Sequence, residues 1–362
     1  MKSITVTTYK SNNYGGVLQA YALQKFQEGL GINNLLLNTP WSNSNTLTSK
    51  NLKSICRELF FVVSSIIHKK ENKLQIKNFQ IFRENYLRCT PLYETNHELK
   101  TNPPEADYYI TGSDQVFSIR SPYQYERLLD WVPHSKAKYS YAASLGEYDW
   151  SDEEAERFTT IISSFNGISV REEYAQELLS KLTNQNIRVN LDPVFLLERD
   201  EYESISVNPN VGEPYIFVYP LISNAGLQEL IDKSRKYLNK KTVAVRKGTS
   251  AKYKFDKVIG GVGPREFLGL IKNSDAVLST SFHGMAFAII FHKPFYVMVK
   301  DYKSQRITNL LEKFGLSDRV FKPGNAVNFS VDFSQADEMI RKGKIDASSY
   351  FAEIERNAAY GR

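Results

Sequence analysis

The segment from Asp275 to Val299 constrains the fold most strongly, because it predicts a strand, a tight turn, an apolar helix and a second strand in succession. A polar run at 279–281 ends the first strand, and an uncharged helix at 285–291 follows. This order places His283 at the carboxyl end of a parallel strand, the edge where open α/β sheets bind ligands. Since a helix amino terminus also favours negative charge, the segment predicts a site for an anionic ligand.

Strands and helices alternate over most of the remaining chain, a pattern typical of doubly wound parallel sheets. The chain opens with a strand at 4–8 and an amphipathic helix at 17–28, and a second unit of the same kind begins with a strand at 215–219. At 362 residues the chain is long for a single core. We therefore predict an α/β fold with two Rossmann-like domains, at 1–200 and 201–362.

Two parts of the chain depart from this alternation. Residues 41–105 predict a helical insertion in the first domain, with helices at 55–67 and 72–86. This insertion would be a lid, a surface that meets a membrane-held substrate, or a helical hairpin packed on the sheet. Separate closing helices are predicted at 336–341 and 350–359.

Composition excludes several classes of protein. The net charge of +6 fits anionic substrates or an anionic membrane surface, but no basic block, zinc motif or helix-turn-helix signature indicates nucleic acid. Cys56 and Cys89 give neither a disulfide framework nor metal spacing, so we expect no metal. The first residues predict a strand rather than a signal peptide, and no run of about 18 apolar residues exists to span a membrane. We therefore expect a cytoplasmic protein.

Three side chains at predicted strand ends are candidates for chemistry. The imidazole of His283 can act as a general acid, as a general base or as a hydrogen-bond donor to an anion. Arg171 ends the strand at 168–171 and offers a fork-shaped anion clamp; alternatively, it is an exposed arginine paired with Glu172 or Glu173. Asp114 follows Gly112-Ser113 at another strand end, where aspartate is also a common turn residue.

Further polar groups are expected to bind substrate at neighbouring strand ends. Arg306 and Lys303 begin the helix after the 295–299 strand, and Arg246 and Lys247 follow the strand at 242–245. Such cations would suit a ligand with a carboxylate and a phosphate. The turn-rich loop with Asn13, Tyr14 and Gly15 predicts a small-ligand loop, although it is not a G-x-G-x-x-G fingerprint.

Six motifs, in order, resemble the polysaccharide pyruvyl transferase family from residue 3 to about 320. The motifs are Asn13–Gln24, Gly112–Phe117, Ser140–Gly146, Ser169–Glu172, Leu191–Phe195 and Ser281–Gly284. The resemblance implies a fold similar to GT-B glycosyltransferases. It also implies transfer of a pyruvyl group from phosphoenolpyruvate to two hydroxyls of a sugar, which makes a cyclic ketal without a cofactor.

The resemblance also implies partners and residue roles. The acceptor would be a lipid-linked or growing cell-surface glycan, such as a capsule or exopolysaccharide, met by peripheral contact at the inner face of the cell membrane. His283 and Arg171 resemble the donor-binding histidine and arginine, and Asp114 lies in the acceptor-side motif. Many members have an arginine where this chain has Ser281, so either another cation such as Arg306 serves there or the donor differs.

Two other functions stay open at this point. A glycosyltransferase of the same architecture would use a nucleotide-sugar, because the basic groups suit a diphosphate equally well. A non-catalytic glycan-binding protein is the third hypothesis, and the serine at position 281 is its only support.

Overall fold

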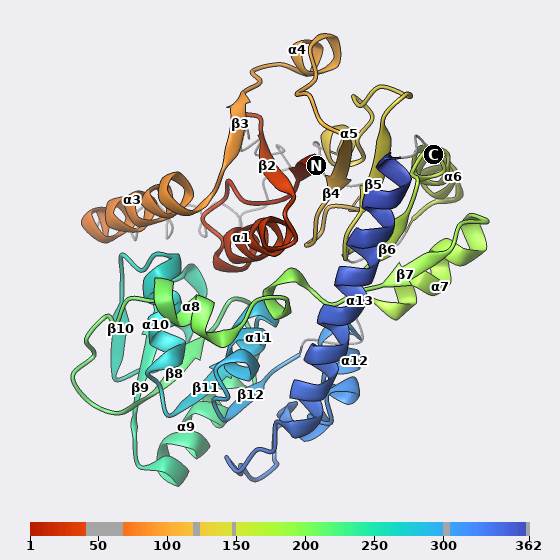
Figure 1. Ribbon diagram of the computed structural model, residues 1–362. Helices are drawn as coiled ribbons and strands as arrows, with labels where there is room; N and C mark the ends of the chain where they lie inside the picture. Colours follow the sequence, from red (N-terminus) through yellow and green to blue (C-terminus); the bar gives the residue numbers. More distant parts are fainter. Residues whose placement is uncertain (41–67, 119–123, 147–149, 300–304, 360–362) are drawn as a thin grey trace. The chain divides into compact units, whose positions relative to one another are not determined.

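The computed structural model describes residues 1–40, 68–118, 124–146, 150–299 and 305–359 (Figure 1). The predicted helix at 55–67, Cys56 and Lys303 lie outside these residues. The chain divides into two compact units. Unit 1 comprises Met1–Ser42, Tyr86–Leu197 and Glu338–Arg362, and unit 2 comprises Asn43–Asn85 and Glu198–Asp337.

Unit 1 is built on a parallel sheet whose strand order is β3-β2-β1-β4-β5. The strands are β1 (Lys2–Val6), β2 (Asn33–Asn38), β3 (Cys89–Leu92), β4 (Tyr108–Thr111) and β5 (Ala137–Ser140). A parallel pair, β6 (Ile168–Val170) and β7 (Ile187–Val189), follows β5 through single bridges such as Ala143 to Val170. All four residues of β4 are buried, as expected of a central parallel strand covered on both faces.

The helices of unit 1 connect these strands in sequence. They are α1 (Tyr14–Gly29), α4 (Asn96–Thr101), α5 (Gln124–Arg127), α6 (Asp152–Ile162), α7 (Glu173–Leu182), the 3-10 turn η1 (Pro193–Phe195) and most of α13 (Ser334–Ala359). Ser151 caps α6, because its hydroxyl accepts the Glu154 N–H while the Glu154 carboxylate accepts the Ser151 N–H.

Unit 2 repeats the same topology, with the parallel order β10-β9-β8-β11-β12. Its strands are β8 (Tyr215–Tyr219), β9 (Lys241–Val245), β10 (Lys257–Ile259), β11 (Ala276–Ser279) and β12 (Phe295–Val297). Its helices are α3 (Lys69–Tyr86, whose last residue clusters with unit 1), α8 (Arg199–Ile205), α9 (Leu227–Leu238), α10 (Pro264–Lys272), α11 (Phe282–Ile290) and α12 (Gln305–Lys313), with 3-10 turns η2 (Gly248–Lys252) and η4 (Ser317–Arg319). Both units are doubly wound, so the predicted α/β fold class is confirmed.

The strand order reverses between β1 and β4 in unit 1, and between β8 and β11 in unit 2. Ligands of open α/β sheets bind at the carboxyl ends of the strands beside such a switch point. The topology therefore predicts that ligand-binding residues follow these four strands.

The predicted helical insertion at 41–105 needs correction. It contains strand β3, which pairs with β2, and the short helix α4. Helix α3 packs in unit 2, where Asn78 Nδ2 donates to the Gly261 carbonyl at 2.8 Å and Arg246 Nε donates to Glu71. These contacts cross more than 170 positions of sequence, which local patterning does not reveal.

The prediction of two closing helices is wrong, because a single helix, α13, runs through both ranges. Gly343 lies in its interior, and a Cβ there would come within 2.3 Å of the Leu191 side chain. The glycine thus allows close packing and does not end the helix. The later part of α13 packs in unit 1, where Tyr350 Oη donates to the Ser140 carbonyl at 3.0 Å and Phe351 stacks on Tyr141 (Figure 1).

Candidate functional site

The ends of β1 and β4 meet at the switch point of unit 1. Thr8 Oγ1 donates to Asp114 Oδ2 at 2.9 Å, and Thr7 Oγ1 donates to the Ser113 carbonyl at 3.0 Å. Asp114 has φ of 71°, a left-handed backbone that is uncommon outside glycine. Aspartate is among the residues that adopt this conformation most readily in turns, so Asp114 is a candidate because of its place at the strand end beside the switch point.

Arg171 lies in a buried ion network beside this aspartate. Its Nη1 donates to Asp192 Oδ2 at 2.6 Å and its Nε donates to Glu172 Oε1 at 3.0 Å, with only 4% of the side chain exposed. Burial disfavours the charged guanidinium, but the carboxylates of Glu172, Asp192 and Asp114 outweigh it and raise the pKa of Arg171. The alternative prediction, an exposed arginine paired with Glu172 or Glu173, is therefore right about the partner Glu172. It is wrong about exposure, because the side chain of Arg171 is buried.

The two carboxylates have further partners that tie the network to neighbouring strands. Ser113 Oγ donates to Asp192 at 3.1 Å, and Ser144 Oγ donates to Glu172 at 2.7 Å. The network thus joins the segments after β4, β5, β6 and β7. Arg171 holds these strand ends together with charge-assisted hydrogen bonds, which are stronger than neutral ones.

The predicted small-ligand loop has a structural explanation at each residue. Asn13 is the N-cap of α1, and its Oδ1 accepts the Gly15 N–H at 3.0 Å and the Gly16 N–H at 3.5 Å. Tyr14 and Gly15 are buried. Because the side chain of Asn13 already satisfies these N–H groups, the start of α1 is less suited to an anion than an uncapped helix.

His283 lies in the first turn of α11, directly after β11 in unit 2, and is 9% exposed. The helix begins after Ser281, whose side chain makes no capping hydrogen bond, in contrast to Asn13 on α1. The Ser281 N–H is instead held by Ser279 Oγ at 2.9 Å. A helix start without a side-chain cap at a switch point is a suitable place for an anionic group.

The close packing of α11 on β11 depends on Gly284. A Cβ at this position would lie 2.3 Å from Ser279 Oγ and 3.1 Å from the Tyr219 ring. We expect Gly284→Ala to lower the free energy of unfolding by about 1–3 kcal/mol, as for other overpacked cores. Urea unfolding of Gly29→Ala is the matched control, since nothing lies within 4 Å of its added Cβ. Equal stabilities of the two variants would contradict the packing argument.

The cations predicted near this edge differ in their surroundings. Arg246 interacts with Glu71 on α3 and with His68, the residue before that helix, so it holds the start of α3 in place. Arg306 lies in the first turn of α12. Lys247 follows β9, and burial lowers the pKa of its ammonium group to about 8.

The lowered pKa of Lys247 predicts a pH dependence of stability. Below pH 8 the folded protein buries a charged ammonium, whereas above the unfolded pKa of about 10.4 the group is neutral in both states. The folded state binds fewer protons between these values, so stability rises with pH there. We expect Lys247→Met to be more stable than the natural chain at pH 7, with a difference that shrinks from pH 8 upward in urea titrations. A constant difference would contradict the burial of this charge.

Among the described residues, no helix is long and apolar enough to cross a bilayer. In the same part of the chain, the His, Cys, Asp and Glu side chains form no group of three that could hold a metal ion.

A family model described as polysaccharide pyruvyl transferase matches residues 13–302. The chain belongs to this family. The match covers strand ends of both units, including Asp114, Arg171 and His283. A search of curated proteins found no match.

Solved structures similar to the chain have low sequence identity. UDP-GlcNAc 2-epimerase from Neisseria meningitidis, bound to UDP-GlcNAc, is 13% identical with a TM-score of 0.49, over 96% of this chain and 100% of that one. An alpha-glucosyltransferase in complex with UDP and a 13-mer DNA is 11% identical with a TM-score of 0.49, over 100% and 94%. ADP-heptose lps heptosyltransferase II from E. coli is 10% identical with a TM-score of 0.42, over 98% and 100%.

Sequence reasoning missed several residues around the candidate site. Asp192, with 1% exposure, was noted only as part of a motif, although it accepts hydrogen bonds from Arg171 and Ser113. The signal available was its place before Pro193, where an aspartate caps the 3-10 turn η1. Thr8 carries no local signal of its own.

Proposed function

We propose that this protein transfers the pyruvyl group of phosphoenolpyruvate onto two hydroxyls of one sugar in a cell-surface polysaccharide or its lipid-linked precursor. The observation that carries the proposal is the family match, whose motif residues Asp114 and His283 follow strands beside the switch points of the two sheets. No resident cofactor is part of the proposal, because phosphoenolpyruvate supplies all the atoms transferred.

The proposed reaction balances without a redox partner. Protonation of C3 of phosphoenolpyruvate develops positive charge at C2, and one sugar hydroxyl adds there. The C2–O bond to phosphate then breaks, phosphate leaves, and a second hydroxyl closes the ketal. The two hydroxyls lose one proton each. One of these protons balances the proton that C3 gains, and the other leaves with the phosphate.

We assign these steps to named side chains. His283 would bind the donor phosphate or protonate C3, and Arg306 would assist with the phosphate, together with Lys303. Asp114 would accept the proton of the attacking hydroxyl. Ser281 leaves the start of α11 without a side-chain cap, which suits an anion from the donor.

The sequence predicts that Arg171 holds the donor carboxylate. Because Nε and Nη1 already meet Glu172 and Asp192, we propose instead that Arg171 positions the strand end that carries Asp114. The small-ligand role of Asn13, Tyr14 and Gly15 stays a prediction, although Asn13 caps α1 and Tyr14 and Gly15 are buried. The net charge of +6 supports peripheral contact with an anionic membrane surface on the cytoplasmic side.

Ligand-induced thermal stabilisation tests the choice of donor. We expect phosphoenolpyruvate to raise the melting temperature of the natural chain, since a ligand that binds only the folded state stabilises it, and nucleotide-sugars to leave it unchanged. Stabilisation by a nucleotide-sugar alone would instead favour a glycosyltransferase. Phosphate release that requires both phosphoenolpyruvate and acceptor would exclude a non-catalytic glycan-binding protein.

A further inference from the structure

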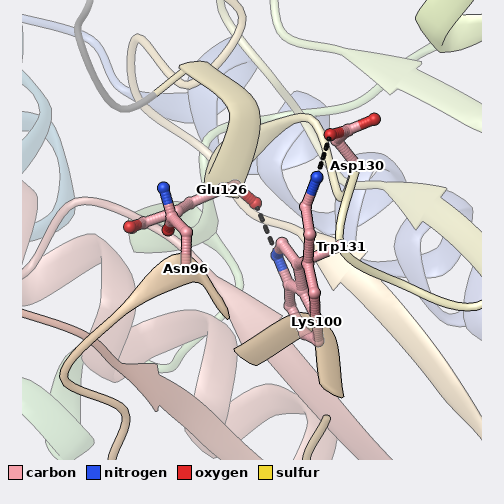
Figure 2. A pocket seen from close by; sticks show the side chains of 5 residues that line it. All are labelled: Asn96, Lys100, Glu126, Asp130 and Trp131. Atoms are coloured by element: carbon pink, nitrogen blue, oxygen red, sulfur yellow. Dashed lines mark hydrogen bonds and ion pairs between the residues drawn. The ribbon is translucent and has the colours of Figure 1, made fainter. Parts of the chain in front are cut away.

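A separate pocket of about 210 Å3 lies in unit 1, lined by Asn96, Lys100, Glu126, Asp130 and Trp131 (Figure 2). Figure 2 shows Asn96 and Glu126 on one side and Lys100, Asp130 and Trp131 on the other. The volume is below the roughly 300–1,000 Å3 of pockets that hold drug-sized ligands. It therefore suits a ligand about the size of one sugar ring.

The walls of the pocket are held in place by interactions within unit 1. Trp131 Nε1 donates to the Glu126 carbonyl at 3.1 Å, and its ring meets Tyr109 edge-on at 5.3 Å. The Glu126 carboxylate accepts a hydrogen bond from Thr39 Oγ1 at 3.0 Å. Thr39 directly follows β2, so the pocket borders the carboxyl edge of the sheet, where Asp114 also lies.

The backbone between these walls is strained. Leu129 is buried and has φ of 56°, which is a rare outlier for a bulky residue. The Leu129 carbonyl accepts a hydrogen bond from the Val132 N–H at 3.2 Å, so the chain turns sharply between α5 and Val132. This turn places Asp130 and Trp131 at the pocket. Such strain costs on the order of 1–3 kcal/mol and tends to persist at functional sites.

The chemistry of the pocket favours a neutral polyhydroxyl ligand over an anion. Lys100 Nζ is paired with Asp130 Oδ2 at 3.1 Å, so the ammonium is neutralised and a second carboxylate, Glu126, would repel a phosphate. Burial raises the pKa of Glu126, although the Thr39 hydrogen bond opposes this. The carboxylates can accept hydrogen bonds from neighbouring sugar hydroxyls and the amide can also donate them, while Trp131, with 5% exposure, contributes only a small apolar part of the lining.

We propose that this pocket is a subsite for one pyranose ring of the acceptor glycan, with Asn96, Glu126 and Asp130 as its hydroxyl-binding groups. The assignment of the ring to the acceptor rests on the proposed function. The pocket would set which sugar of the glycan is presented at the sheet edge beside Asp114.

Saturation-transfer NMR with methyl pyranosides of glucose, galactose and mannose, and of their 2-acetamido forms, tests this subsite directly. We expect at least one pyranoside to bind the natural chain, and the double variant Asn96→Ala/Asp130→Ala to weaken its Kd at least tenfold. His97→Ala is the control, because His97 is an exposed residue of α4 that does not line the pocket, and it should keep the affinity. Binding of inorganic phosphate in competition with the sugar, an unchanged Kd in the double variant, or no binding of any pyranoside would overturn the proposal.

The same variants separate this proposal from the proposed function. Asn96→Ala/Asp130→Ala should retain the thermal stabilisation by phosphoenolpyruvate, because neither residue is assigned to the donor. Sugar binding that the double variant abolishes, in a protein that phosphoenolpyruvate does not stabilise, would support the subsite and contradict the donor. Stabilisation by phosphoenolpyruvate with unaltered sugar binding in the double variant would support the donor and contradict the subsite.

Discussion

His283→Ala is expected to lower kcat by about 10²–10⁴-fold, the usual contribution of a positioned acid or base. The histidine lies in the first turn of α11, beside the switch point of unit 2, where donor phosphate and the transferred proton are proposed to meet it. Phosphate release from phosphoenolpyruvate in the presence of an acceptor extract measures the effect. The melting temperature should change little, because alanine still fits the helix.

His134→Ala provides the control for this experiment. His134 is exposed in a turn of unit 1, so its loss should leave turnover unchanged. If His283→Ala retains near-normal turnover while folded, His283 is not the group that handles the donor phosphate or the C3 proton.

Arg171→Ala is expected to cost about 3–5 kcal/mol in the free energy of unfolding, because it leaves two buried carboxylates without their cation. Asp192 and Glu172 are both buried, and both accept charged hydrogen bonds from this one guanidinium. All three tryptophans of the chain belong to unit 1. Urea unfolding followed by tryptophan fluorescence therefore reports on the unit that the substitution affects.

Arg341→Ala is the matched control in the same unit. Its ion pair with Glu338, at 2.8 Å, is 61% exposed on the arginine side, and exposed pairs contribute about 0–1 kcal/mol. A loss for Arg171→Ala no larger than for Arg341→Ala would show that the buried network does not hold the strand ends.

Much of the fold could be predicted because most strands and helices carry strong local patterns. The strand at 215–219 was predicted with the bounds that the structure has. Strand β3 was missed because it is only four residues long and contains Pro91, which an edge strand tolerates. Strand β10 has three residues and relies on pairing with β9.

For the candidate site, the sequence predicts which residues lie at strand ends but not which partners their side chains have. Strand ends identified Asp114 and Arg171 in unit 1 and His283 in unit 2, since residues that follow parallel strands come to the carboxyl edge of their own sheet. The partner of Arg171 at Asp192, 21 positions away, depends on how β6 and β7 pair. The sugar-sized pocket likewise needs the backbone of Leu129, whose left-handed conformation no local sequence signal indicates.

The most direct test of the account is mass spectrometry of acceptor glycolipids incubated with the purified protein and phosphoenolpyruvate. The glycolipids would be extracted from cells that lack this protein. We predict a product heavier by pyruvic acid less one water, with one phosphate released per product, and formation about 10²–10⁴-fold slower with His283→Ala. A product that appears only with a nucleotide-sugar, and carries an added sugar in place of the ketal, would contradict the account.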